Sequence, residues 1–309
     1  MVPQCLDMGA DSNQYRAAER HLMDAIRAGV VCDFADGAEV TAESMSSWGP
    51  ERTVRATLLR RLLTAENAEY RADGVQLRGA AVEGTLDLAD MNVLKFDLEQ
   101  CRIDTVEARR AVFTGDAWFG GATFTGDAEF RDATFTGDAE FTGATFTGDA
   151  WFGGATFTGD AWFEGATFTG DAWFPDATFT RHAQFTGTTF TGHALFTGAI
   201  FSGIAEFHVA IARAYDFSKA QFHASDPGPW VARRVRLTGT VFHVRARLTV
   251  ATAETDCRRL QAREGVHLIV LGGPVDLEDA EFLRRSILTR RALRVRTGCS
   301  RTRQSWRTP

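Results

Sequence analysis

Aspartate recurs every eleven residues through the middle of this 309-residue sequence. The series consists of Asp116, Asp127, Asp138, Asp149, Asp160 and Asp171. Its next two positions are occupied by His182 and His193. Evenly spaced carboxylates can bind cations, attract a basic or DNA-binding protein, or accept hydrogen bonds from backbone N–H groups at turns. The choice among these depends on the elements that hold the carboxylates.

The aspartates belong to an eleven-residue repeat with the form Ala-Thr-Phe-Thr-Gly-Asp-Ala-x-Phe, which runs from Ala111 to Phe207. A fixed short period is typical of a solenoid, in which each unit stacks on its neighbours. An eleven-residue period can also indicate a helical coiled coil. Thr, Phe and Gly-Asp in every unit favour short strands and turns instead.

A quieter rhythm surrounds this segment. From Val75 to Phe222, apolar residues two apart recur at steps of about five. Residues two apart on a strand share one face, so we expect each pair to point inward and the middle residue to point outward. Four such sides make one coil of 22 residues in the Phe-rich part, and the segment provides about seven coils.

The small-x-large rhythm, seen in Ala111-Val-Phe113 and in every Ala-x-Phe unit, resembles the pentapeptide-repeat family. The eleven-residue form resembles a Phe-rich variant of it. The resemblance covers roughly half of the chain and implies an all-β solenoid, a right-handed quadrilateral (four-sided) parallel β-helix. It implies a scaffold more strongly than any one activity, because the family hosts several.

The other segments are predicted from composition and periodicity. Residues 1–72 form a small α-helical N-terminal cap that covers the open edge of the first coil. One helix is capped by Asp11 or Ser12 and runs to about Ala28, with Gly29 as its stop, and a second begins near Ser47 with Pro50 in its first turn. Residues 73–224 form the β-helix, 225–283 a degenerate β-helical C-terminal region, and 284–309 an Arg-rich tail expected to be disordered.

The inward residues explain the fold. Each buried Phe ring contributes about 2–3 kcal/mol, and the alanines leave the space that the rings fill. Thr188 stands where the repeat otherwise has Ala, so its buried hydroxyl requires a hydrogen-bond partner. We assign no cofactor or metal site to these residues.

The outward residues form columns, because residues 22 apart stack on one another. Asp116, Asp138 and Asp160 make one column, and Asp127, Asp149 and Asp171 make another on the opposite side. The simplest interpretation is that each Asp caps its own Thr-Gly-Asp corner. A basic or DNA-competing partner and cation binding remain alternatives.

Tryptophan occupies outward positions on two further sides. The candidate residues are Trp118 and Trp162 on one side and Trp151, Trp173 and Leu195 on the other. The last three are consecutive in their column and predict an exposed apolar strip, which is typical of a protein contact, including self-association as a homodimer. Thr-Phe-Thr triplets form flat ranks on the remaining sides; such ranks resemble ice-binding surfaces, although Thr is also a common strand residue.

Net charge is −6, but residues 111–207 carry 12 Asp and Glu against 2 Arg, whereas residues 208–309 carry 9 against 19 Lys and Arg. Five scattered cysteines without a C-x-x-C pair favour reduced thiols and a cytoplasmic location. The sequence predicts neither a membrane span nor an N-terminal signal segment.

Motifs of phosphate-binding loops, serine hydrolases and zinc proteases are absent from the sequence, so we expect a protein that is not an enzyme. The leading hypothesis is a non-catalytic scaffold for protein–protein interaction or self-association. Resemblance to quinolone-resistance pentapeptide proteins suggests, as an alternative, a DNA-mimic regulator of a topoisomerase such as gyrase. Binding to ice or another ordered surface is a third hypothesis.

Overall fold

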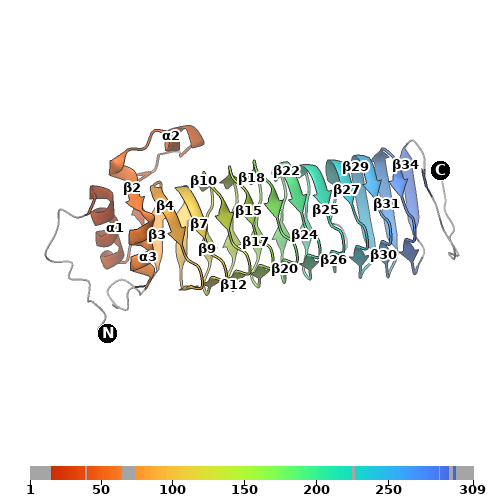
Figure 1. Cartoon of the computed structure of the whole chain (residues 1–309), viewed down its shortest axis with the longest axis horizontal. Coiled ribbons are helices and arrows are strands. Elements are labelled where there is room, and N and C mark those ends of the chain that lie inside the picture. The colour runs from red at the N-terminus through yellow and green to blue at the C-terminus, as the bar shows by residue number, and fades with distance from the viewer. Residues whose placement is uncertain are drawn as a thin grey trace.

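The chain folds into a straight rod of stacked coils with helices at its N-terminal end (Figure 1). This computed structural model describes residues 15–38, 40–64, 74–224, 227–284, 286–291 and 295–296. Nearly all strands pair in parallel with the strand one coil away, so the sheets run along the rod. The predicted four-sided solenoid with parallel sheets and a small helical cap is confirmed.

The cap contains both helices and strands. Its elements are α1 (Ala17–Ala28), β1 (Cys32–Asp33), α2 (Ala42–Ser46), a 3₁₀ turn (Pro50–Arg52), β2 (Thr53–Arg55) and α3 (Ala56–Thr64). Helices α1 and α3 bury Leu22, Leu59 and Leu62 in the same apolar core as Val75 and Leu77 of the first coil. Strands β1 and β2 pair with β3 and β4, so the cap also adds a partial coil that covers the sheet edge.

Both helix starts differ from the prediction. Helix α1 begins at Ala17, because the Glu19 side chain accepts a hydrogen bond from the Arg16 backbone N–H and caps the helix there. Its end at Gly29, with φ of 65°, is confirmed. The helix expected from Ser47 begins only at Ala56, because residues 53–55 are drawn into strand β2 by pairing with residues 81–83.

Four faces enclose the core. The first face is an eight-stranded sheet with β1, β3 (Val75–Arg78), β6 (Phe96–Glu99), β9 (Ala117–Trp118), β13 (Ala139–Glu140), β17 (Ala161–Trp162), β21 (Ala183–Gln184) and β24 (Ala205–Glu206). The fourth face is a ten-stranded sheet with β5 (Asn92–Val93), β8 (Val112–Phe113), β12 (Thr134–Phe135), β16 (Thr156–Phe157), β20 (Thr178–Phe179), β23 (Ile200–Phe201), β26 (Gln221–Phe222), β28 (Val241–Phe242), β30 (Gln261–Ala262) and β33 (Glu281–Phe282).

The second and third faces are joined where long strands continue around their shared corner. These strands are β4 (Ala81–Asp87), β7 (Arg102–Glu107), β22 (Thr189–Leu195), β25 (Ile211–Asp216), β27 (Trp230–Arg236) and β29 (Ala246–Asp256). Short strands on the second face are β10 (Thr123–Phe124), β14 (Thr145–Phe146) and β18 (Thr167–Phe168). Those on the third are β11 (Ala128–Glu129), β15 (Ala150–Trp151), β19 (Ala172–Trp173), β32 (Val275–Asp276) and β35 (Val295–Arg296), while β31 (Val266–Gly272) and β34 (Ile287–Arg291) extend the same sheet.

Coil length changes along the rod. In the centre Thr134 pairs with Thr156, so one coil takes 22 residues as predicted. In the C-terminal part Val241 pairs with Gln261, and the coil takes 20. The solenoid has about ten turns, more than the seven expected between Val75 and Phe222, because regular pairing continues beyond that segment.

The C-terminal strands continue into the segment that was expected to be disordered. Strand β34 pairs with β31, and β35 pairs with β32, so part of residues 284–309 is paired strand. Residues 285, 292–294 and 297–309 of that segment lie outside the described residues.

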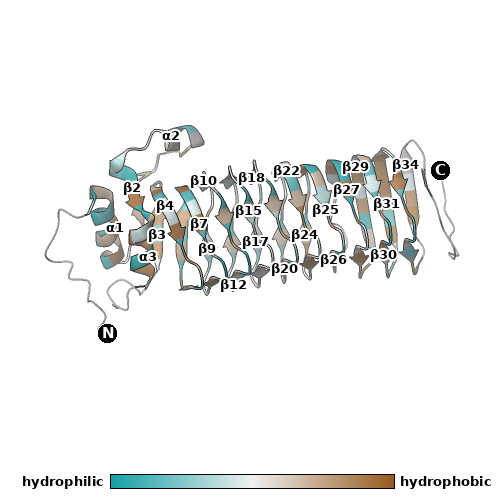
Figure 2. Cartoon of the chain, viewed as in Figure 1, coloured by the Kyte–Doolittle hydropathy of each residue, from teal (hydrophilic) through white to brown (hydrophobic). Residues whose placement is uncertain are grey.

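Stacked phenylalanines fill the central core, and apolar residues recur along the coils in Figure 2. Rings one coil apart lie face to face, as in Phe146 and Phe168 with centroids 4.5 Å apart. Rings on adjacent faces meet edge to face, as in Phe141 and Phe152 at 5.6 Å. The buried Thr188 hydroxyl donates to the Phe163 carbonyl at 2.7 Å, which confirms that it has a partner.

Candidate functional site

The aspartate columns are hydrogen-bond ladders between coils. Each carboxylate Oδ1 accepts a hydrogen bond from the backbone N–H of the residue 22 positions later, on the next coil. The pairs, with N–O distances, are Asp116–Asp138 (2.9 Å), Asp138–Asp160 (2.8 Å), Asp127–Asp149 (3.0 Å) and Asp149–Asp171 (2.8 Å). The predicted role as corner caps is therefore corrected, because the N–H group that is bound belongs to the following coil.

The Gly before each Asp allows this close stacking. A Cβ atom at Gly148 would lie 2.6 Å from Asp127 Oδ1 and 2.7 Å from the Gly126 carbonyl oxygen, closer than real side chains approach. The same restriction applies to Gly137, Gly159, Gly170 and Gly192. The Thr-Gly-Asp motif thus provides an acceptor and a corner without a side chain in its way.

The two histidines end the ladders through their backbone. His182 N–H donates to Asp160 Oδ1 at 3.1 Å, and His193 N–H donates to Asp171 Oδ1 at 2.8 Å. The His193 ring Nδ1 lies 3.2 Å from that same carboxylate, and Glu206 lies 3.3 Å from His182 Nε2. In the part of the chain that the structure describes, no three His, Cys, Asp or Glu side chains are grouped so that they could hold a metal ion.

Trp151 and Trp173 stack on the third face with centroids 4.8 Å apart and planes 11° apart. The Arg131 guanidinium lies 4.7 Å above the Trp151 ring, in the geometry of a cation–π contact. Leu195 pairs with Trp173 on the next coil. We call Arg131, Trp151, Trp173 and Leu195 the aromatic strip.

The aromatic strip is less exposed than the sequence predicted. Trp151, Trp173 and Leu195 are each half-buried, because stacking between coils covers their faces. Arg131 is held by a two-point contact with Glu129, whose Oε1 lies 2.6 Å from the Arg131 Nε. Glu129 is only 5% exposed, and Arg109 also contacts it at 3.2 Å. The strip is therefore preorganised by a buried carboxylate.

The other two candidate tryptophans lie apart from the strip, on the first face. Trp118 is 42% exposed and pairs in register with Asp97 and Glu140. Burial raises the pKa of the Asp97 carboxyl. Trp162 is half-buried and meets the His182 ring at 5.3 Å. The structure thus joins Trp151 to Trp173 but leaves the first-face tryptophans separated by Glu140.

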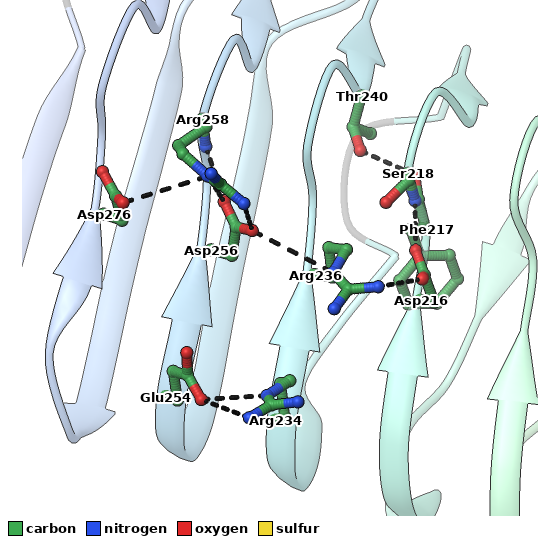
Figure 3. A network of polar contacts seen from close by, with 10 residues as sticks. All are labelled: Asp216, Phe217, Ser218, Arg234, Arg236, Thr240, Glu254, Asp256, Arg258 and Asp276. Atoms are coloured by element: carbon green, nitrogen blue, oxygen red, sulfur yellow. Dashed lines mark hydrogen bonds and ion pairs between the residues drawn. The ribbon is translucent and has the colours of Figure 1, made fainter.

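Sequence analysis missed a charged ladder on the same third face, drawn in Figure 3. Arg236 contacts Asp216 at 2.8 Å and Asp256 at 4.0 Å, and Arg258 contacts Asp256 at 2.7 Å and Asp276 at 3.9 Å. Desolvation by burial acts to raise the pKa of the Asp256 carboxyl, but hydrogen bonds from Arg258 outweigh it and the pKa is lowered. The 20-residue spacing of these acids was the signal that could have revealed the ladder.

A hollow of about 320 Å³ lies beside this ladder and is lined by Thr238, Arg258, Arg259, Glu278 and Asp279. Its two arginines face two acids, so their charges offset one another. The hollow therefore has no excess charge with which to select an ion.

Buried thiols are also unsuited to chemistry. Cys32, Cys101 and Cys257 are free and buried, whereas Cys5 and Cys299 lie outside the described residues. Desolvation raises the pKa of Cys32 and of Cys101 to about 12, which keeps both thiols protonated. Among the helices that the structure describes, none combines the length and the apolar character needed to cross a membrane.

Stacked four-sided coils with repeated outward columns define a β-solenoid repeat protein. The family model for pentapeptide repeats (9 copies) matches residues 72–134, 98–145, 119–167, 141–189 and 163–211. The solenoid of this chain belongs to the pentapeptide-repeat family. The search of curated proteins found no match, and the search of solved structures found none either.

Proposed function

We propose that this pentapeptide-repeat solenoid is a non-catalytic scaffold that binds another protein through the aromatic strip. The observation that carries the proposal is the stack of Trp151 on Trp173 beneath the Arg131 guanidinium. Trp and Arg are the residues that most often dominate the binding energy of protein interfaces.

The surroundings of the strip suit a protein contact. Charged ladders lie in register on either side of it, with Glu129 before Trp151 and Asp216 after Leu195. An apolar centre with a charged rim is the usual anatomy of an interface. Because Glu129 fixes Arg131 and stacking fixes the rings, little side-chain entropy is lost when a partner binds.

The repeated outward groups also support a binding role rather than catalysis. A catalytic site needs one asymmetric constellation, whereas the Thr-Gly-Asp corners present the same groups on coil after coil. The aspartates of the two columns each use an oxygen to hold the next coil. The DNA-mimic alternative therefore rests on net charge alone.

The test replaces both Trp151 and Trp173 with Thr, the outward residue at equivalent positions of the second and fourth faces. The matched control is Trp118→Thr, which removes an outward tryptophan of the first face. Each tagged protein is used to capture partners from an extract of the source cells, with quantification by mass spectrometry.

We expect the double variant to lose at least one partner that the wild type and Trp118→Thr retain, with unchanged circular dichroism. If capture and solution mass are the same for all three proteins, the proposed function is wrong. Partner loss in Trp118→Thr alone would move the site to the first face and would equally contradict the proposal.

A further inference from the structure

The second face has two chemically different halves. Its outward column is Thr123, Thr145, Thr167 and Thr189, followed in register by Ile211, Val231, Ala251 and Leu271. Ile211, Val231 and Leu271 are 48%, 40% and 42% exposed. We call these the threonine half and the apolar half. Consecutive exposed aliphatic residues on a flat sheet face are unusual for a surface in contact with water only.

Charge along the adjoining corner changes sign at the same place. Beside the threonine half, the corner between the second and third faces carries Asp127, Asp149 and Asp171. Beside the apolar half it carries Arg213 and Arg233, both exposed. Neither arginine forms an ion pair with another described residue. The face is thus apolar and basic at one end and polar and acidic at the other.

We propose that the second face binds the second face of another copy of this chain, with the two rods antiparallel. A two-fold axis that crosses the face between Thr189 and Ile211 places Val231 of one copy against Thr167 of the other. It also brings Arg233 of each copy to the level of Asp171 of its mate. The contact is isologous, because both copies use the same surface and every pair occurs twice.

The dimensions of the face fit such a contact. Eight strands at about 4.8 Å span about 38 Å along the rod, and five outward-facing residues at about 3.3 Å span about 16 Å across it. Each copy would bury about 600 Å², or about 1,200 Å² in total, which is the low end of specific interfaces. We therefore expect a weak dimer that salt weakens further, because exposed charges are screened.

Self-association on the second face is independent of the aromatic strip, which lies on the third. The proposed function and this inference can consequently fail separately. Other occupants of the face, such as an unrelated acidic protein, would leave the purified chain monomeric.

The test is sedimentation equilibrium of the purified full chain at low and high salt over a hundredfold range of concentration. We expect the mass to rise toward twice the 33.9 kDa of one chain at low salt. Arg233→Glu and Val231→Glu should each weaken dimerisation at least tenfold. The matched control is Arg247→Glu, which reverses an exposed arginine elsewhere on β29 and should leave the dimer intact.

A compensating variant guards against a trivial loss of folding. Thr169→Arg lies on the exposed corner beside Asp171, so adding it to Arg233→Glu should restore dimerisation. A monomer at every concentration would overturn the proposal. So would a dimer that ignores both second-face substitutions, or one that is lost in the Trp151/Trp173 variant, which would place self-association on the aromatic strip.

Discussion

The coils between Ala117 and Phe207 and those after Ile211 stack their strands alike but differ in perimeter. The central coils take 22 residues and bury four Phe rings each, whereas the later coils take 20 and bury mainly Leu, Val, Ala and Cys. Larger side chains need a wider enclosure at constant packing density. The extra residue in each Thr-Gly-Asp corner provides it.

The two regions also hold their carboxylates differently. In the centre, an Asp on each coil accepts from the backbone N–H of the next coil. In the later coils, Asp216, Asp256 and Asp276 alternate with arginines that pair with them across coils. The acidic charge of the centre is consequently a result of how its corners are built, and the ion pairs of the end replace that arrangement.

The largest expected effect concerns the central core. Phe152→Ala removes a ring that stacks on Phe130 and Phe174 and meets Phe141 edge to face. We expect the free energy of unfolding in urea to fall by about 3–5 kcal/mol. Phe152→Leu, as control, should cost less than half as much. Equal losses for both would mean that the ring stack does not fill the core as described.

The corner glycine gives the next effect. Gly148→Ala would place a methyl group against the Gly126 carbonyl, so we expect a loss of about 2–3 kcal/mol in the same urea measurement. Gly143→Ala is the matched control, since that position has φ of 66° but nothing within 4 Å, and it should cost only about 1 kcal/mol. A larger cost at Gly143 would contradict the close-approach explanation.

A third substitution tests perimeter directly. Leu237 follows Phe217 in the inward column where the coil has shortened to 20 residues. Leu237→Phe should overpack this coil and lower the melting temperature, with a cost of about 1–3 kcal/mol. An unchanged or higher melting temperature would show that a 20-residue coil accepts the larger ring.

The smallest effect concerns pH. Because the folded pKa of Asp256 lies below its unfolded value of about 3.9, its ion pair stabilises the fold above that pH and the benefit is lost as the pH falls through the folded pKa. We expect wild type to exceed Asp256→Asn by about 1 kcal/mol at pH 7, with the gap closing below pH ~3.9. In an Arg258→Met background the gap should be smaller at neutral pH. A gap independent of pH would contradict the pairing.

Much of the fold was predictable because the repeat states it many times. Inward Phe and Ala, the 22-residue coil and the buried Thr188 hydroxyl all follow from spacing and volume. The start of α3 was not predictable, because residues 53–55 leave a helical pattern only to pair with β4, which lies far along the chain.

The candidate surfaces were only partly predictable. Every repeat carries the same Asp, so the sequence cannot distinguish a bond within a corner from one to the next coil. Stacking of Trp151 on Trp173 follows from their spacing, but their burial depends on Arg131 and Glu129. The C-terminal coils were underestimated because their inward residues vary, which weakens the five-residue rhythm.

The central claim is that the aspartate columns hold the coils together. The most direct measurement compares the free energy of unfolding of two triple variants, in which Asp127, Asp149 and Asp171 are all Asn or all Ala. Both variants remove the same charge, but only Asn keeps the Oδ1 acceptor. We predict that the Asn variant stays within about 1 kcal/mol of wild type while the Ala variant loses about 3 kcal/mol. Equal stability of the two variants would contradict the account.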